Sequence, residues 1–432
     1  MTSPLRIWHP FTNAAVDAPP LHAVRAEGAY IYTADGRKIL DAVSSWWVNI
    51  HGHGNPRIAA AIAEQARKLE HVILAGFTHD AAEELAARLG ARLPAELRHM
   101  FFSDDGSTAV EVALKLAVQY FSNQGRVEKS EIVALEHAYH GDTAGAMAVS
   151  DDSPFTAPFN SMRYRVHRVH SAYCHQCPVG LTRDTCHIEC VNKLEILLQE
   201  RAGRIAAVIV EPLLQAAGGM IVHPVEFLQK VRALCTQHDV LLIADEVLTG
   251  FGRSGKMFAC ELAEVVPDLM CLSKGITGGF LPMGATVCTD QVEAPFRSQN
   301  RMHTFYHGHS YTGNALACAA AVASLKIFDD EPVFERISAI AGVHTERLEQ
   351  LRGSPKVGDV RQIGSIGAVE LRTDDSGYLS SVRTKLYKFF LDHDVLLRPL
   401  GNVIYVLPPY VASPEEIDHV YDVIGQAIET VI

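Results

Sequence analysis

Polar residues that could do chemistry stand directly after five short apolar runs in the middle of the sequence. The runs occupy residues 100–102, 132–135, 207–210, 241–244 and 269–272. The polar residues that follow them are 103–107, 136–140, Glu211, Asp245 with Glu246, and Ser273 with Lys274. Runs that are apolar on both faces are typical of strands in a buried parallel sheet. Because ligands bind beyond the carboxyl ends of such strands, we expect these polar residues to share one crevice.

This set of residue types fits the requirements of pyridoxal 5′-phosphate. Lys274 would form a Schiff base with the aldehyde of the cofactor and later carry a proton. Asp245 would keep the ring nitrogen protonated, which makes the ring an electron sink. Gly106 and Ser107 precede a helical pattern, so backbone N–H groups and the positive end of the helix dipole would face the phosphate. Tyr139 would lie against the ring.

Each of these motifs has an ordinary structural interpretation when it is taken alone. A glycine and serine before a helix commonly form only a turn and an N-cap, and a carboxylate after a strand commonly begins a loop. A lysine after a strand is usually a surface residue. Their combination in this order, with flexible glycines at Gly275, Gly278 and Gly279, favours the cofactor site.

The elements that must position these residues predict an α/β fold. Helical patterns at 109–121 and 224–238 alternate with the apolar runs, which indicates one large wound domain over 58–328 with a mostly parallel sheet. The two chain ends, 1–57 and 329–432, have shorter mixed patterns. They include expected strands at 364–371 and 403–407 and an expected helix at 413–432. We expect both ends to pack together as a smaller α+β domain.

Longer motifs extend this interpretation to nearly the whole chain. They occupy 105–111, 138–142, 210–212, 241–255, 272–279 and 307–314. In this order they resemble the class III pyridoxal-phosphate aminotransferases of fold type I. The resemblance implies the roles given above for Lys274, Asp245, Gly106, Ser107 and Tyr139. It also implies a homodimer with shared active sites, in which Gly308 contacts substrate and His309 and Ser310 reach the phosphate of the neighbouring subunit.

The chain ends indicate which substrate the resemblance implies. Segments 7–12, 44–47, 397–401 and 405–410 resemble the branch of the family that converts 8-amino-7-oxononanoate to 7,8-diaminononanoate in biotin biosynthesis. There Phe11, Trp46 and Arg398 would bind substrate with Tyr139 and Lys274. A guanidinium and an aromatic wall suit a long chain that ends in a carboxylate. The structural alternative is that Trp46 and Trp47 are both core residues.

Two departures from the family pattern leave alternatives open. Phe11 stands where many members have tyrosine, and His309 with Ser310 stands where other members have proline and threonine. The amino donor is S-adenosylmethionine in most members and lysine in some. Another class III activity, on a diamine or an ω-amino acid, is the alternative function.

Four cysteines form a separate group at Cys174, Cys177, Cys186 and Cys190, with two histidines between them. They would suffice for a tetrahedral zinc site, but the spacing between the pairs is shorter than in common zinc ribbons. Similar insertions in the resembling aminotransferases have no catalytic duty. We therefore expect reduced thiols and no metal. A catalytically silent protein organised by zinc is a further hypothesis, against which the Lys274 and Asp245 pair argues.

Composition excludes several classes of protein. The 432 residues are 48% hydrophobic and 20% charged, as in an ordinary globular protein. The net charge of −12 disfavours nucleic acid and anionic membranes as partners. No apolar run is long enough to cross a membrane, and residues 1–6 lack the apolar core of a signal peptide. With an odd count of nine cysteines, these features predict a cytoplasmic protein.

Overall fold

A seven-stranded sheet forms the centre of the larger part of the molecule. The structure is a computed structural model that describes residues 7–374 and 377–432, so the signal-peptide prediction for residues 1–6 lies outside the described residues. In spatial order the strands are β4 (Leu97–Ser103), β12 (Gly284–Thr289), β11 (Leu269–Leu272), β10 (Leu241–Asp245), β7 (Ile205–Val210), β5 (Glu131–Leu135) and β6 (His167–Val169). Only β12 runs antiparallel to its neighbours, which confirms the predicted mostly parallel sheet.

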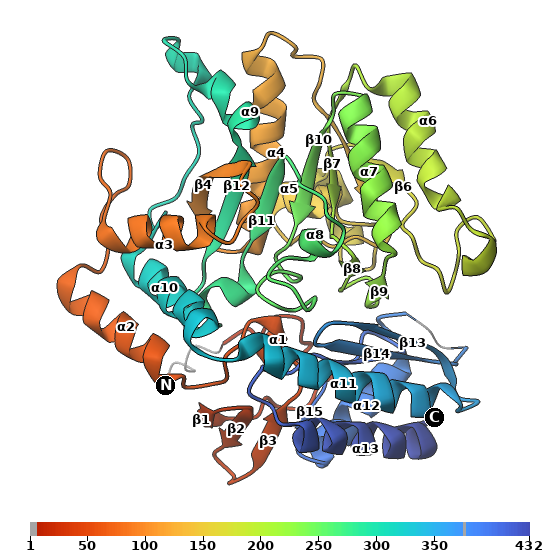
Figure 1. Ribbon diagram of the computed structural model, residues 1–432. Helices are drawn as coiled ribbons and strands as arrows, with labels where there is room; N and C mark the ends of the chain where they lie inside the picture. The colour runs from red at the N-terminus through yellow and green to blue at the C-terminus, as the bar shows by residue number, and fades with distance from the viewer. Residues whose placement is uncertain (1–6, 375–376) are drawn as a thin grey trace.

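Helices cover both faces of this sheet, as Figure 1 shows. They are α4 (Gly106–Asn123), α5 (Ala144–Val149), α6 (Asn192–Arg201), α7 (Val225–Gln237), α8 (Ala259–Leu262) and α9 (Asp290–Glu293). Alternate residues of β7 enter two different apolar clusters: Val208 and Val210 one, Ala207 and Ile209 the other. This double burial explains why the strands are apolar at every position.

Three further helices pack together at the edge of the sheet. They are α2 (Pro56–Lys68), α3 (Asp80–Gly90) and α10 (Ala315–Asp330), and α10 contacts both of the others. One of them, α3, contacts β4 at the edge of the sheet. Short 3₁₀ segments complete the large part of the chain. They are η1 (Ala157–Met162), η2 (Arg183–Thr185), η3 (Glu189–Val191), η4 (Lys274–Thr277), η5 (Ala294–Phe296) and η6 (Arg301–His303).

The two ends of the chain meet below the large sheet, where the red N-terminal strands lie beside the blue C-terminal elements in Figure 1. One sheet has the order β1 (Ala23–Glu27), β2 (Tyr30–Thr33), β3 (Lys38–Asp41) and β15 (Val395–Leu396). A second contains β13 (Val357–Ile363), β14 (Ile366–Leu371) and β16 (Val403–Val406), and a two-stranded sheet contains β8 (Leu214–Gln215) and β9 (Ile221–Val222). Because β15 pairs in parallel with β3, both ends build one sheet, as the fold prediction expected.

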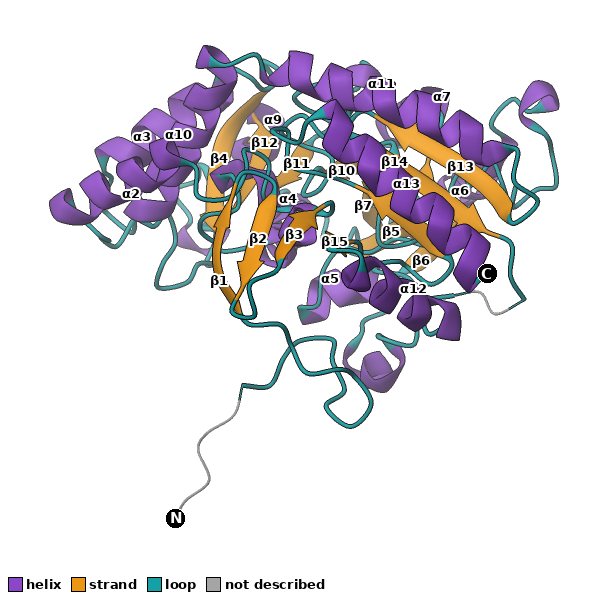
Figure 2. Cartoon of the chain, turned by 90° about the horizontal axis from the view of Figure 1, so that it is seen from below, coloured by secondary structure: helices purple, strands orange, loops and turns teal. Residues whose placement is uncertain are grey.

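Helices of the C-terminal segment lie over β13 and β14 and next to β15, as the view from below shows (Figure 2). They are α11 (Val333–Arg352), α12 (Ser381–Asp392) and α13 (Pro414–Val431). Helix α11 packs on β13 and β14, and α13 packs on α11 and α12. The domain boundaries at 57/58 and 328/329 stay a prediction, and the second falls within the last turn of α10. Among the described residues, no helix is both long and apolar enough to span a membrane.

Candidate active site

The carboxyl ends of the parallel strands bring the expected lysine and carboxylates together. Asp245 ends β10, Glu211 follows β7, and Lys274 begins η4 just beyond β11. The charges of Asp245 and Glu211 both act on the Lys274 amine. Burial nevertheless lowers the pKa of Lys274, although a part of its side chain stays accessible. A lowered pKa makes the neutral amine, which is the nucleophilic form, easier to reach.

Asp245 is held in one orientation by hydrogen bonds from two sides. Its Oδ2 lies 2.7 Å from Nδ1 of His140, and its Oδ1 accepts the backbone N–H of Val247 at 3.1 Å. Both the Asp245 and His140 side chains are buried. The neighbouring Glu246 instead accepts N–H groups at the start of α8 and the hydroxyl of Thr249, so it is a structural residue. The structure thus separates two carboxylates that are adjacent in sequence.

Glu211 links the strand ends to the turn that carries Tyr139. Its Oε1 accepts the Tyr139 N–H at 3.1 Å, and its Oε2 accepts the Ala216 N–H at 3.2 Å. Burial raises the pKa of Glu211 to about 7, and the negative charge of Asp245 acts in the same direction. Near neutral pH this carboxyl can therefore hold a proton beside the lysine.

The Gly106–Ser107 turn lies at the start of α4, next to the turn of residues 139–143. Asp105 caps the helix by accepting the N–H of Thr108 at 2.8 Å. Ser107 Oγ accepts the N–H of Thr143 at 3.0 Å. Gly141 has a positive φ of 131°, and a Cβ there would lie 2.2 Å from Ser107 Oγ. Only glycine allows this close approach of the two turns.

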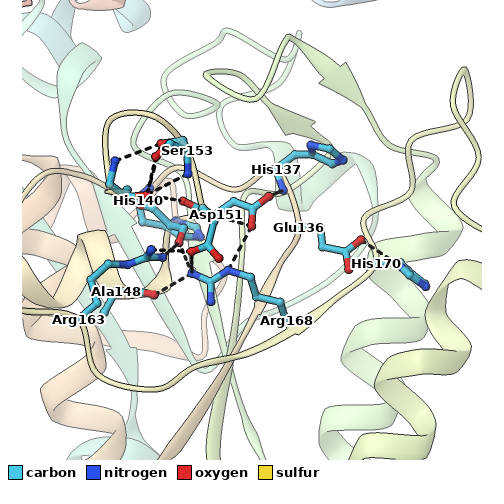
Figure 3. Close-up of polar contacts among 12 residues, drawn as sticks. Glu136, His137, His140, Ala148, Asp151, Ser153, Arg163, Arg168 and His170 are labelled. Atoms are coloured by element: carbon cyan, nitrogen blue, oxygen red, sulfur yellow. Dashed lines mark hydrogen bonds and ion pairs between the residues drawn. The ribbon is translucent and has the colours of Figure 1, made fainter. Parts of the chain in front are cut away.

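The turn with Tyr139 and His140 is anchored from behind by a polar network, drawn in Figure 3. Asp151 accepts the His137 N–H at 2.6 Å and pairs with Arg168 Nε at 3.2 Å, while its own N–H donates to Ala138 O at 2.8 Å. Arg168 also donates to the carbonyls of Ala148 and Ser150 at the end of α5. These contacts fix the backbone that presents Tyr139 and His140.

These residues fit pyridoxal 5′-phosphate, judged by the chemistry of the donor set. An accessible amine of lowered pKa, a carboxylate fixed by two donors, and a helix start kept open by glycine are the three groups that the cofactor needs. A Cβ at Gly106 would meet Val247 Cγ1 at 2.5 Å, so α4 begins directly over the segment that follows Asp245.

One tryptophan lies beside Lys274 and the next one beside Arg398. Lys274 Nζ is 4.8 Å from the ring centre of Trp47, whose indole N–H donates to the Tyr405 hydroxyl at 3.0 Å. Arg398 Cζ lies 4.8 Å from the ring centre of Trp46, and Phe11 packs edge-on against Trp46 at 5.3 Å. Trp47 is buried and Trp46 is 40% exposed, so the two tryptophans have different environments.

The tryptophans owe their positions to an unusual backbone. Ser44, Ser45, Trp46 and Trp47 have φ between 45° and 77°, a region that costs roughly 1–2 kcal/mol for each non-glycine residue. The segment is tied down because Ser44 Oγ donates to Leu407 O at 2.8 Å and Ser45 Oγ donates to Asp41 at 2.7 Å. Arg253, which is buried, donates to Trp47 O at 3.4 Å.

The expected residues Gly308, His309 and Ser310 lie apart from this group. His309 Nε2 is 3.8 Å from Asp104 Oδ1, beside the start of α4. Within residues 7–374 and 377–432, no hydrogen bond or ion pair links Gly308, His309 or Ser310 to Lys274 or Asp245.

The cysteine group lies in the loop between β6 and α6. Cys177 Sγ accepts the N–H of Leu181 at 3.4 Å, and Cys186 Sγ accepts the N–H of Ile188 at 3.1 Å. All four cysteines of the group are free thiols. In the described part of the chain, no three His, Cys, Asp or Glu side chains are arranged to hold a metal ion.

Sequence reasoning missed several residues of this site. His140 and Trp47 lie within the motifs at 138–142 and 44–47, but nothing in these motifs predicts the contact of His140 with Asp245 or of Trp47 with Lys274. A histidine directly after an aromatic at a strand end was the available signal for His140. No signal marked the left-handed backbone of residues 44–47, because the segment contains no glycine.

Comparisons with known proteins agree with this geometry. The family Aminotransferase class-III matches residues 11–428. The adenosylmethionine-8-amino-7-oxononanoate aminotransferase of Synechococcus elongatus is 46% identical over 432 residues and covers 100% of both chains. The enzyme of the same name from Geobacter sulfurreducens is 43% identical and covers 98% of this chain and 96% of its own.

Solved structures of related enzymes share the fold. The adenosylmethionine-8-amino-7-oxononanoate aminotransferase of Methanocaldococcus jannaschii superposes with a TM-score of 0.91 at 35% identity, covering 98% of this chain and 96% of its own. An amine transaminase from an uncultivated Pseudomonas species has a TM-score of 0.91 at 32% identity, covering 99% and 98%. The family and fold predicted from the motifs are confirmed, and the chain belongs to the class III aminotransferases.

Proposed function

We propose that this protein transfers an amino group to 8-amino-7-oxononanoate, giving 7,8-diaminononanoate in biotin biosynthesis. The observation that carries the proposal is the full-length identity of 46% to the Synechococcus elongatus enzyme, together with Arg398 placed over Trp46 outside the lysine. A permanently charged guanidinium next to an aromatic face suits a carboxylate at the end of a long apolar chain.

Pyridoxal 5′-phosphate, when bound, supplies an electron-withdrawing ring that stabilises charge at the substrate carbon. Lys274 would hold its aldehyde, Asp245 would pair with its ring nitrogen, and Ser107 with the start of α4 would bind its phosphate. Tyr139 would lie beside the ring. His140 keeps the Asp245 carboxylate oriented through the 2.7 Å contact.

The chain's own residues divide the work of the reaction. The Lys274 amine, with its pKa lowered by burial, can take up and release a proton at Nζ. Trp47 covers the lysine on one side and excludes water there. Arg398, Trp46 and Phe11 would orient the keto acid so that its carbonyl carbon, and not its carboxylate, faces Lys274.

The same proposal includes a homodimer in the cytoplasm. In the described residues, no hydrogen bond or ion pair links Gly308, His309 or Ser310 to Lys274 or Asp245 of their own chain, which suits residues that serve a neighbouring subunit. Around them Ile73, Phe77, Tyr306 and Tyr311 are each more than half exposed. Sedimentation should give twice the mass of the chain, and an active monomer would refute the shared site.

A spectroscopic titration tests the reaction. S-adenosylmethionine, lysine, a diamine and an ω-amino acid are added one at a time to purified holoenzyme while the visible absorbance of the cofactor is followed. We propose S-adenosylmethionine as the donor, so it alone should bleach the absorbance, and 8-amino-7-oxononanoate should restore it. If lysine alone bleaches the absorbance, the amino donor is lysine and not S-adenosylmethionine. Bleaching only by a diamine or an ω-amino acid, without recovery by the keto acid, would replace the substrate with that of the alternative aminotransferase.

A further inference from the structure

Four aromatic rings from four separate segments touch one another at the outer end of the site. Phe11 packs edge-on against Trp46 at 5.3 Å and against Phe155 at 6.1 Å, and Phe155 packs edge-on against Tyr378 at 4.5 Å. The row begins beside Arg398, which lies over Trp46. Phe155 and Tyr378 belong to none of the motifs that identified the site from the sequence.

Phe155 is held in place by a tight turn in the loop between α5 and η1. Ser153 N donates to Thr156 Oγ1 at 2.9 Å, and Thr156 N donates to Ser153 O at 3.1 Å. The turn follows Asp151, which Arg168 and the His137 N–H fix in the network of Figure 3. The same anchor therefore sets both the Tyr139 turn and the position of the Phe155 ring.

Tyr378 is held beside the loop that carries Arg398. A Cβ at Gly401 would lie 2.3 Å from Gly377 O and 3.1 Å from Tyr378 N, so the two segments are in direct backbone contact. Ser380 then caps α12 by accepting the Val382 N–H at 3.1 Å. Arg398 and Tyr378 also both act electrostatically on the buried Tyr405. The row of rings thus starts and ends near the Arg398 loop.

The rings present apolar surface to solvent although they touch one another. Phe11 is 46% exposed, Trp46 40% and Phe155 38%. Neighbouring apolar groups that stay exposed mark a binding surface more often than isolated ones do. Two guanidinium groups lie over rings of this surface. Arg398 Cζ is 4.8 Å from the ring centre of Trp46, and Arg383 Cζ is 4.5 Å from that of Tyr378. Apolar rings with a guanidinium match an aliphatic chain that ends in a carboxylate.

We propose that Phe155 and Tyr378 are specificity-determining residues that form the outer wall for the aliphatic chain of the keto acid. Together with Phe11 and Trp46 they enclose the methylene groups while Arg398 holds the carboxylate. The proposal rests on the proposed function for the identity of the acceptor. The proposed wall needs the aromatic ring of Tyr378 and does not need its hydroxyl group.

Binding of an unreactive probe tests the wall directly. Nonanoate has the same number of chain carbons as the acceptor and no keto group, and calorimetry with the holoenzyme measures its affinity. Phe155→Ala and Tyr378→Ala should each weaken binding about tenfold, as expected for loss of hydrophobic contact in a pocket. Phe159→Ala, in η1 directly after this loop and 47% exposed, and Leu379→Ala, beside Tyr378 and 70% exposed, are the matched controls and should bind as wild type does. Tyr378→Phe should also bind normally.

Kinetics separate the acceptor from the donor. In Phe155→Ala and Tyr378→Ala, kcat/KM for 8-amino-7-oxononanoate should fall about tenfold. The rate of bleaching by the donor should stay within about twofold. An unchanged nonanoate affinity, an equal loss in the controls, or a loss confined to the donor step would overturn the inference. If both alanine variants lose nonanoate affinity but the wild type does not aminate the keto acid, the proposed function is wrong. Phe155 and Tyr378 would then still form a wall that binds an aliphatic chain.

Discussion

The inner and the outer part of the site are built in different ways. The inner group, Asp245, Glu211 and His140 around Lys274, comes from the ends of neighbouring strands. Its two carboxylates and His140 are buried, and each carboxylate is fixed by hydrogen bonds. The outer group, Phe11, Trp46, Phe155, Tyr378 and Arg398, comes from loops and chain ends and stays partly exposed. A rigid interior suits proton transfer and charge stabilisation, which need fixed geometry. A wall of loops suits the choice of substrate.

This contrast means that damage to the inner group should abolish turnover, whereas damage to the outer group should change which substrate is used. Substitutions in the two groups therefore have separable signatures in kcat and in kcat/KM.

Lys274→Ala should have the largest effect. The variant loses both the covalent anchor for the cofactor and the base at the reacting carbon, so kcat should fall by at least about 10⁴-fold. Turnover and visible absorbance are measured beside Lys256→Ala, an exposed lysine in the loop between β10 and α8, which should behave as wild type. If the Lys274→Ala variant has a kcat near that of the wild type, Lys274 is not the catalytic lysine.

Asp245→Asn should have the next largest effect. The amide keeps the shape and can still accept from Val247, but the negative charge that would pair with the ring nitrogen is lost. We expect kcat to fall about 10²- to 10³-fold with little change in KM for the keto acid. A change in KM alone would assign Asp245 to the outer group instead.

The pH dependence of stability tests Glu211 in the cofactor-free protein. Burial raises its pKa to about 7, above the value in the unfolded chain. The wild type therefore gains stability from the protonated form at low pH and loses it as pH rises through the interval from about 4.5 to about 7. Relative to wild type, Glu211→Gln should gain up to about 3 kcal/mol over this interval, measured by urea unfolding. A difference that stays constant with pH would show that the pKa of Glu211 is the same in the folded and the unfolded protein.

Removal of metal should have the smallest effect. If the cysteine loop holds no zinc, overnight treatment with EDTA should leave both kcat and the melting temperature unchanged. Stoichiometric zinc in the untreated protein, lost together with stability on chelation, would instead make the loop a structural metal site.

The sequence is informative about the inner group because each of its residues follows an apolar run. Strand periodicity places Asp245, Glu211 and Lys274 at one edge once the sheet is known to be parallel. The outer group carries no such pattern. Phe155 and Tyr378 lie in irregular loops, and their 4.5 Å contact joins segments more than 200 positions apart, which no local rule can predict.

Two further features of the backbone, the left-handed run at 44–47 and the pairing of β15 with β3, depend on contacts between remote segments. The left-handed run at 44–47 depends on tertiary anchors such as the Ser44 contact with Leu407 O, which is remote in the chain. The sequence predicts that the two chain ends pack together but not that β15 pairs with β3, because register between distant segments is set by the whole fold.

We propose that the outer group selects the acceptor by its carboxylate, while the inner group performs the transfer. The most direct test compares kcat/KM for 8-amino-7-oxononanoate with that for its methyl ester, in wild type and in Arg398→Ala. Wild type should prefer the free acid about 100-fold, as a paired carboxylate implies. Arg398→Ala should lose that preference and use both compounds alike. A preference that persists without Arg398, or that wild type lacks, would show that Arg398 does not select the acceptor.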